Sequence, residues 1–431
     1  MDFNILDFGA IADGKTMNTK AIQAAIDECA KEGGRVVVPA GLFMSGSIFL
    51  RSNVELHLAH NATLRASENL EDYNADDAYE QNWGSVNEGW NAKHFIIAVE
   101  CENVAITGTG TIDGNSSVFF EPYRPASDFQ EESMVNAGYC WKKGKAMNLD
   151  KVNRRPGQMI CFIECRNIIV RDVSLINSTC WSCFVYGCDF VRISGIKIDN
   201  TFYHANTDGI DIDTSRYVTI SDCIILTGDD CITFRGCGKR LKDQDRCCEY
   251  VTVTNCVLSA SAAAFRIGVG TFPVRHITVS NVSVIYCGEF INYCAEWANT
   301  SKTPFEDIIF SNAAIEHTNR LLTLKVNHGT TVKDIKLHNI TAKECLSAAM
   351  IYSSEPGVID NFLLDNVDVT SVGNDVEDDD DAPKDMKRAF VNFYNVDNLT
   401  FKNCNFTVPE EHKKDYETDI EIKNCKNFRN I

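Results

Sequence analysis

The sequence predicts an all-β fold, a parallel β-helix whose coils stack one on the next. A short pattern recurs through most of the 431 residues: an alternating β-branched stretch, a turn residue and a second apolar stretch, as in "VTVTNCVL" around Asn255. Its copies follow one another every 23 to 37 residues, and they carry period-2 strands with no convincing helix. Strand-and-turn repeats of this length are typical of a solenoid.

The turn position of the repeat supports this fold. Asparagine recurs there, and asparagine tolerates a left-handed corner while its side-chain amides can hydrogen-bond along a stack. The copies place this residue at Asp172, Gly195, Asp222, Asn255, Asn281, Asn312, Asn339, Asn366 and Asn403. A leucine-rich repeat would need leucines at fixed sites, and a propeller blade would need longer units with hairpin turns. Neither pattern is present.

The N-terminal end of the predicted stack needs a cover, because an open sheet edge invites aggregation. Residues 19–32, within "NTKAIQAAIDECAKEGG", predict a helical cap. One helical face collects the apolar residues Ile22, Ala25, Ile26, Cys29 and Ala30.

We expect one domain over residues 1–431, interrupted by two segments. The segment at about 114–155 is rich in aromatic and charged residues and is long enough to wall a cleft. The segment at about 372–388 contains "NDVEDDDDAPKD" and is expected to be a solvated acidic loop, with calcium binding as the alternative.

Charge and composition limit the partners. A formal charge of −19 argues against a nucleic-acid groove or an anionic membrane as partner, and no run of 18 apolar residues could span a bilayer. The N-terminus lacks a basic region followed by an apolar core, which favours the cytoplasm, with secretion as the alternative if a leader was removed. Neither a cofactor nor a metal is expected, and the oligomeric state stays open.

The cysteines favour a reducing compartment. Their number, 19, is odd, and several lie beside repeat corners, as Cys165 and Cys188 do. Buried reduced thiols explain this better than disulfides. Cys180 and Cys183 form a lone CxxC without a matching second pair, so we do not assign it to zinc.

Two acidic clusters carry the predicted chemistry. Asp208 and Asp229 are 21 residues apart, close to one short coil, so their backbones should lie on neighbouring strands about 4.8 Å apart, with Asp230 alongside. Carboxylates that converge in this way can keep one acid protonated while its neighbours stay ionised. Such a pair suits hydrolysis of a glycosidic bond. The alternative is a set of aspartates that cap local turns.

Together with several other motifs, these acidic clusters resemble those of the polygalacturonase family of glycoside hydrolases, the pectin-degrading parallel β-helix enzymes. The matching motifs are "NTDG" at 206–209, "GDD" at 228–230, "ITGTGTIDG" at 106–114, "RRPGQMICFIEC" at 154–165 and "NSTCWS" at 177–182. The resemblance implies a right-handed β-helix and an inverting hydrolase. In that mechanism Asp229 protonates the leaving oxygen, and Asp208 and Asp230 activate water. Inversion is expected to require about 6.5–9.5 Å between acid and base.

Two motifs of the family are missing. Ala263 stands where the family has the histidine of Gly-His-Gly, and Phe290, Ile291 and Asn292 replace Arg-Ile-Lys. Loss of the cationic pair removes the charge-assisted bonds that select a uronate. We therefore expect a substrate other than plain polygalacturonate, such as rhamnogalacturonan or a neutral or decorated sugar, and exo action on short oligosaccharides.

Several nearby residues are candidates for substrate binding: His204, Asn206, Asp211, Arg235, Arg266, Glu296 and Trp297. Arg235 and Arg266 could clamp an anion or could pair with the surplus acids. His204 could replace the lost imidazole. Glu289 and Glu296 could bind hydroxyls, and Tyr293 and Trp297 could stack on a sugar or simply cover their neighbours.

Two other classes of protein remain possible on this fold. One is a carbohydrate-binding protein that lost turnover together with the missing motifs. The other is a polysaccharide lyase, which would need a basic residue to take a proton and usually calcium.

Overall fold

The computed structural model describes residues 1–82, 92–120, 155–294, 302–326, 329–373 and 382–431. They form two compact units. Unit 1 holds residues 1–82, 92–120, 155–229 and 238–246, and unit 2 holds residues 230–237, 247–294, 302–326, 329–373 and 382–431. Most of the predicted insertion at 114–155 and the centre of the acidic loop at 372–388 lie outside the described residues.

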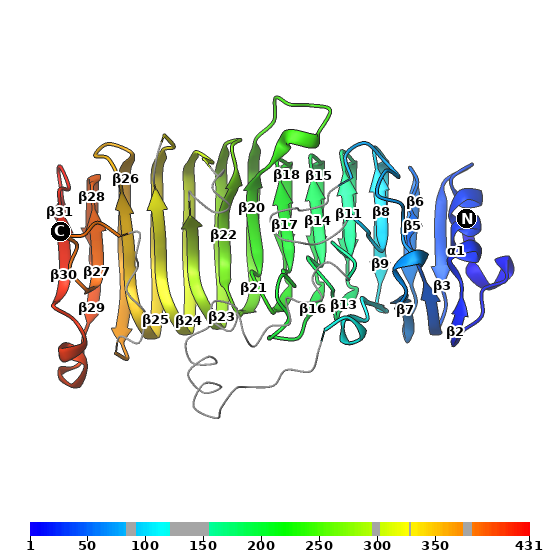
Figure 1. The fold of residues 1–431 in the computed structure, drawn as a ribbon, viewed down its shortest axis with the longest axis horizontal. Helices are drawn as coiled ribbons and strands as arrows, with labels where there is room; N and C mark the ends of the chain where they lie inside the picture. The colour runs from blue at the N-terminus through cyan, green and yellow to red at the C-terminus, as the bar shows by residue number, and fades with distance from the viewer. Residues whose placement is uncertain (83–91, 121–154, 295–301, 327–328, 374–381) are drawn as a thin grey trace. The chain divides into compact units, whose positions relative to one another are not determined.

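Unit 1 consists of parallel strands in three columns, each strand pairing with its counterpart one coil earlier (Figure 1). The first column is β5 (Ile48–Phe49), β8 (Ile96–Val99), β11 (Ile160–Ile163), β14 (Cys183–Tyr186) and β17 (Ile210–Asp213). The second is β1 (Asp2–Asn4), β3 (Gly34–Val38), β6 (Val54–Leu58), β9 (Glu102–Gly108), β12 (Arg166–Arg171), β15 (Asp189–Ser194) and β18 (Arg216–Ser221). The third is β2 (Asp13–Met17), β4 (Gly41–Ser45), β7 (Ala62–Ala66), β10 (Thr111–Asp113), β13 (Ser174–Ile176), β16 (Lys197–Asp199) and β19 (Ile224–Thr227).

Unit 2 repeats the parallel pairing with longer strands, several of which run through the corners of the coil. These strands are β20 (Ile232–Gly236), β21 (Cys248–Ala260), β22 (Ala263–Gly270), β23 (Val274–Cys294), β24 (Phe305–Val326), β25 (Val332–Ser353), β26 (Ile359–Ser371), β27 (Ala389–Tyr394), β28 (Val396–Lys402), β29 (Asn405–Thr407), β30 (Thr418–Lys423) and β31 (Arg429–Asn430). Each unit therefore has the coil-on-coil pairing of a parallel β-helix, which confirms the predicted fold class.

The asparagine corners are confirmed in unit 2. Asn281, Asn312, Asn339 and Asn366 all adopt left-handed backbone, with φ of 54° to 56°. Their side chains form a ladder in which Asn312 Nδ2 donates to Asn281 Oδ1 at 3.1 Å and Asn339 Nδ2 donates to Asn312 Oδ1 at 3.0 Å. The amides of Asn281, Asn312 and Asn339 thus use both a donor and an acceptor on neighbouring coils, which fixes the register of the stack.

The helical cap is also present. Helix α1 (Thr19–Cys29) buries Ile22, Ala25, Ile26 and Cys29 on one face, and it lies at the N-terminal end of unit 1 (Figure 1). Short 3₁₀ turns occur elsewhere: η1 (Ile5–Phe8), η2 (Leu70–Asp72), η3 (Ser116–Val118), η5 (Gly238–Arg240) and η7 (Glu410–Asp415). Within the described ranges, no helix is long and apolar enough to cross a membrane.

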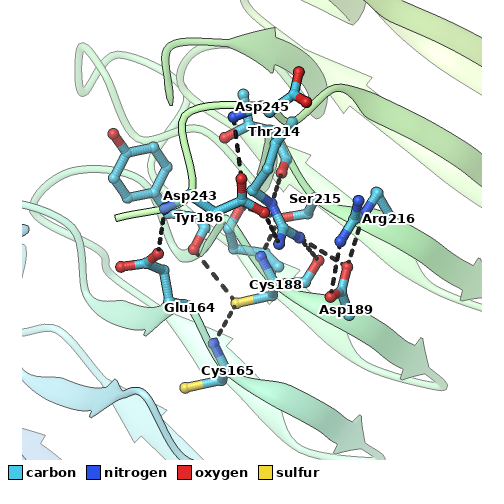
Figure 2. Close-up of polar contacts among 12 residues, drawn as sticks. Glu164, Cys165, Tyr186, Cys188, Asp189, Thr214, Ser215, Arg216, Asp243 and Asp245 are labelled. Atoms are coloured by element: carbon cyan, nitrogen blue, oxygen red, sulfur yellow. Dashed lines mark hydrogen bonds and ion pairs between the residues drawn. The ribbon is translucent and has the colours of Figure 1, made fainter. Parts of the chain in front are cut away.

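Within unit 1, polar contacts hold residues 238–246 against the preceding coils (Figure 2). The Arg246 guanidinium donates to the Thr214 carbonyl at 3.1 Å and pairs with Asp189 at 2.7 Å. The same Asp189 pairs with Arg216, and Glu164 accepts the backbone N–H of Asp243 at 3.3 Å. Figure 2 also shows Cys165 and Cys188 stacked on successive coils, where they are buried thiols, as the corner pattern predicted.

Candidate active site

Asp208 and Asp229 lie on successive coils of unit 1, as their spacing predicted. Asn206 takes a left-handed backbone conformation with φ of 60°, and its N–H donates to Asp229 Oδ2 at 2.9 Å. Gly228 is required beside this turn, because a Cβ there would lie 2.3 Å from the His204 carbonyl oxygen. The glycine of "GDD" thus lets two coils approach closely enough to bring the two acids together.

The carboxylates of Asp208 and Asp229 come close together. An oxygen of Asp208 and an oxygen of Asp229 lie within 4.8 Å of each other. This distance joins the nearest oxygens, whereas the ~6.5–9.5 Å expected of an inverting pair is measured between the carboxyl groups, so that expectation stays a prediction. Asp208 is only 4% exposed, while Asp229 is half-buried.

A buried arginine that the sequence reasoning did not single out supports this acid pair. Arg155 is 0% exposed, and its guanidinium donates to the carbonyls of Thr179 and Ala205 and to Asn206 Oδ1, the last at 2.9 Å. Burial lowers the pKa of Arg155, and the charges of Asp229 and Asp208 act in the opposite direction. Arg155 therefore holds the turn that donates to Asp229 and places positive charge near both acids.

His204 lies beside this arginine but does not act as a charged group. Its ring stacks on Phe120 with the centroids 4.0 Å apart, and Nδ1 lies 3.3 Å from Ser116 Oγ. Burial, followed by the charge of Arg155, lowers the pKa of His204 to about 4. The imidazole is therefore neutral above that pH.

Asp230 opens unit 2, and its carboxylate contacts two residues of β22. Oδ1 accepts the backbone N–H of Ala263 at 2.8 Å, and Oδ2 lies 3.2 Å from Arg266 Nε. Burial raises the pKa of Asp230, while Arg266 and the Ala263 N–H oppose that rise. The position where the family has a histidine thus contributes a backbone donor instead of an imidazole.

Arg266 continues into a row of polar side chains across unit 2. Arg266 Nη1 donates to Asn292 Oδ1 at 2.9 Å, and the Asn292 amide donates to Glu289. Thr323 Oγ1 completes the row with a 3.0 Å bond to Glu289. Of the two roles considered for Arg266, the ion pair with a surplus acid is the one observed.

The remaining candidates lie in different settings. Arg235 is buried, and its charge acts on Asp230. Asp211 is 0% exposed within β17, which argues against the direct substrate contact expected of it. Tyr293 is buried and its hydroxyl donates to the Thr303 carbonyl at 2.7 Å, so it packs in the core rather than on a sugar. Glu296 and Trp297 lie outside the described residues.

A parallel β-helix that carries two close carboxylates on adjacent coils, one buried and one half-buried, has the architecture and the chemical groups of a glycoside hydrolase. The model of glycosyl hydrolases family 28 matches residues 30–250, more than half of the 431 residues. The protein belongs to this family, which confirms the resemblance seen in the motifs.

Relatives agree with this assignment. An exo-poly-α-D-galacturonosidase of Dickeya chrysanthemi is 29% identical over 275 residues, covering 56% of this chain and 43% of the relative. A probable polygalacturonase of Vitis vinifera is 28% identical over 239 residues, covering 54% and 44%. The chain thus spans less than half the length of these relatives.

Among solved structures, the family 28 exopolygalacturonase of Yersinia enterocolitica superposes with a TM-score of 0.68 at 20% identity, covering 99% of this chain and 78% of that one. At this level of identity the superposition shows a shared fold.

Proposed function

We propose that the protein is an exo-acting glycoside hydrolase that cleaves pectin-related oligosaccharides with inversion. The observation that carries the proposal is the close pair Asp208 and Asp229, held on successive coils of a family 28 chain. Asp229 protonates the leaving oxygen, and Asp208 and Asp230 activate the water. The relatives named as exo-acting galacturonosidase and exopolygalacturonase support exo action.

The environment of Asp230 suits a base. Burial raises its pKa, and a carboxylate with a raised pKa takes up a proton more readily once it is ionised. Arg266 and the Ala263 N–H limit the rise, because both interactions favour the ionised carboxylate.

The substrate is a sugar chain other than plain polygalacturonate. Ala263 and Asn292 replace two groups that the resemblance implies for uronate recognition, and Arg266 is engaged by Asp230 and Asn292. Within the described part of this row, Arg266 is bonded to two side chains, which favours rhamnogalacturonan or a neutral or decorated sugar at the cleaved bond.

We also propose a cytoplasmic location, in which the enzyme processes short imported oligosaccharides. Cys101, Cys165 and Cys188 are buried thiols rather than disulfides, as is usual in a reducing compartment. Fractionation of the native host tests this: recovery of the protein only outside the cytoplasm would contradict it.

The Asp229→Asn variant tests the proposed reaction. Its turnover of pectin-derived oligosaccharides should fall by at least about 1,000-fold while ligand affinity is retained, because the amide cannot supply the proton. Asp222→Asn is the matched control, since Asp222 lies at a left-handed corner where other coils carry asparagine. Mass spectrometry of the products measures turnover, and an unchanged rate in Asp229→Asn would overturn the assigned role.

The products separate the remaining alternatives. NMR of the first product reports its anomeric configuration, and retention would refute inversion. An unsaturated product would indicate a lyase. Binding of every oligosaccharide without turnover would indicate a carbohydrate-binding protein.

A further inference from the structure

Unit 2 contains a cavity that the proposed reaction does not use. It has a volume of about 510 Å³ and is lined by residues of β23, β24 and β25, together with Val372. This volume falls in the range of small-ligand pockets, roughly 300–1,000 Å³. Tyr286, His317, Asn319, Glu344, Leu346 and Val372 contribute to its wall.

Three of these residues form a row on successive strands. Tyr286 is in register with His317, and His317 is in register with Glu344. His317 Nδ1 lies 2.7 Å from Glu344 Oε2, and both side chains are about half-exposed. The cavity therefore presents an aromatic ring, an imidazole and a carboxylate along one side.

Asn319 provides a polar group in need of a partner. The residue is 2% exposed, and its Nδ2 has no hydrogen-bond acceptor among the residues that the structure describes. A buried donor left without an acceptor destabilises a protein by about 1–3 kcal/mol, so nearly all such groups are paired. Because Asn319 lines the cavity, an occupant with hydroxyl groups would supply the missing partner.

We propose that this cavity is a subsite for a neutral sugar unit of the oligosaccharide. Leu346 and Val372 offer apolar contact to the C–H face of a sugar ring, while Asn319 and Glu344 offer a donor and an acceptor to its hydroxyls. The Glu344 carboxylate repels a uronate, and no lysine or arginine lines the cavity within the described residues. The subsite therefore favours an uncharged sugar.

The position fits a substrate that also reaches the proposed catalytic row. Asn319 directly precedes Arg320, which is in register with Glu289, and Glu289 is in register with Ala263, the partner of Asp230. Three strand steps of ~4.8 Å place the subsite about 14 Å along the stack from Asp230. This assignment rests on the proposed function and adds that the substrate carries neutral sugars away from the cleaved bond.

Filling the cavity tests the subsite. Isothermal titration with galactobiose as the neutral probe and digalacturonate as the charged probe is carried out in the Asp229→Asn background, where turnover does not interfere. Leu346→Trp should weaken galactobiose binding by at least about tenfold and leave digalacturonate binding unchanged, since it removes the space for the neutral sugar. Ile285→Trp is the control, because Ile285 is an exposed neighbour of Tyr286 that does not line the cavity.

Asn319→Ala provides a second variant that does not depend on tolerance of a large side chain. It should weaken galactobiose binding by about tenfold, the effect of one lost hydrogen bond, without lowering the melting temperature, since it removes an unpaired buried donor. Galactobiose binding that is absent in the parent or unaffected by both substitutions would overturn the subsite. Hydrolysis by the wild type is measured separately. If the two cavity variants weaken galactobiose binding but the wild type hydrolyses no oligosaccharide, the proposed function is refuted and the subsite stands. If the wild type hydrolyses oligosaccharides but neither variant weakens galactobiose binding, the subsite is refuted and the proposed function stands.

Discussion

Asp229 in unit 1 and Asp230 in unit 2 are neighbours in sequence, but their carboxylates have different kinds of partner. In unit 1, Asp229 accepts a backbone N–H from a turn that Arg155 holds by hydrogen bonds to carbonyls and to an amide. In unit 2, Asp230 pairs directly with the side chain of Arg266. Two residues adjacent in sequence thus have different electrostatic surroundings, one set by a positioned backbone and the other by an ion pair. Such a difference lets two carboxylates take different protonation roles.

Replacing the buried arginine of unit 1 should have the largest effect. Arg155→Met leaves the carbonyls of Thr179 and Ala205 and the amide oxygen of Asn206 without their donor, and each loss is worth about 1–3 kcal/mol. We expect a loss of at least ~3 kcal/mol in urea unfolding and, because the acid turn shifts, at least about 100-fold lower turnover. Arg192→Met, at an exposed position of β15, is the control. Wild-type stability in Arg155→Met would show that Arg155 does not hold the turn.

Removing the cation of unit 2 should act on pH dependence instead. Arg266 opposes the rise in the pKa of Asp230, so Arg266→Met should raise that pKa further. Asp230 then stays protonated to higher pH, and the acidic limb of the kcat profile should move to higher pH by about one unit or more. Arg275→Met, which breaks a pair with Glu249, should leave the profile in place. An unmoved acidic limb in Arg266→Met would contradict a role for Asp230 as base.

The smallest effect is expected at His204, and it concerns stability. Its pKa of about 4 in the folded protein lies below its ordinary value of 6.5, so the folded state binds fewer protons than the unfolded state between these values. The contribution of His204 to stability is therefore fully present above pH 6.5 and is lost as the pH falls toward 4.

His204→Gln should accordingly flatten the decline of the melting temperature between pH 6.5 and 4. The decline should not vanish, because burial also lowers the pKa of His94 to about 4. His276→Gln, at a partly exposed position beside Asp307, is the comparison variant. The same slope in the wild type and in His204→Gln would show that His204 is protonated normally.

Local chemistry explains which parts of the fold could be predicted. The asparagine corners could be predicted from the sequence, because tolerance of a left-handed backbone is an intrinsic property of asparagine. A second set of left-handed corners was missed, since it mixes residue types: Phe190 stacks on Tyr217, and Tyr250 stacks on His276. At those corners the stabilising contact is between coils, and no single residue type reveals it.

The candidate site shows the same division. The pairing of Asp208 with Asp229 could be predicted from one coil length, whereas the role of Arg155 could not. The partners of Arg155, at Thr179, Ala205 and Asn206, follow it by 24 to 51 residues and meet it only when the coils are stacked.

The sequence by itself determined the coil repeat, the capped N-terminal end and the placement of two acids on successive coils, because each follows from spacing and from local backbone preference. Only the tertiary structure decided how close Asp208 and Asp229 come and which cation forms an ion pair with Asp230. Those outcomes depend on the left-handed turn at Asn206, on the close contact at Gly228 and on side chains from other coils. Distances and partners across coils are properties of packing, and one strand cannot specify them alone.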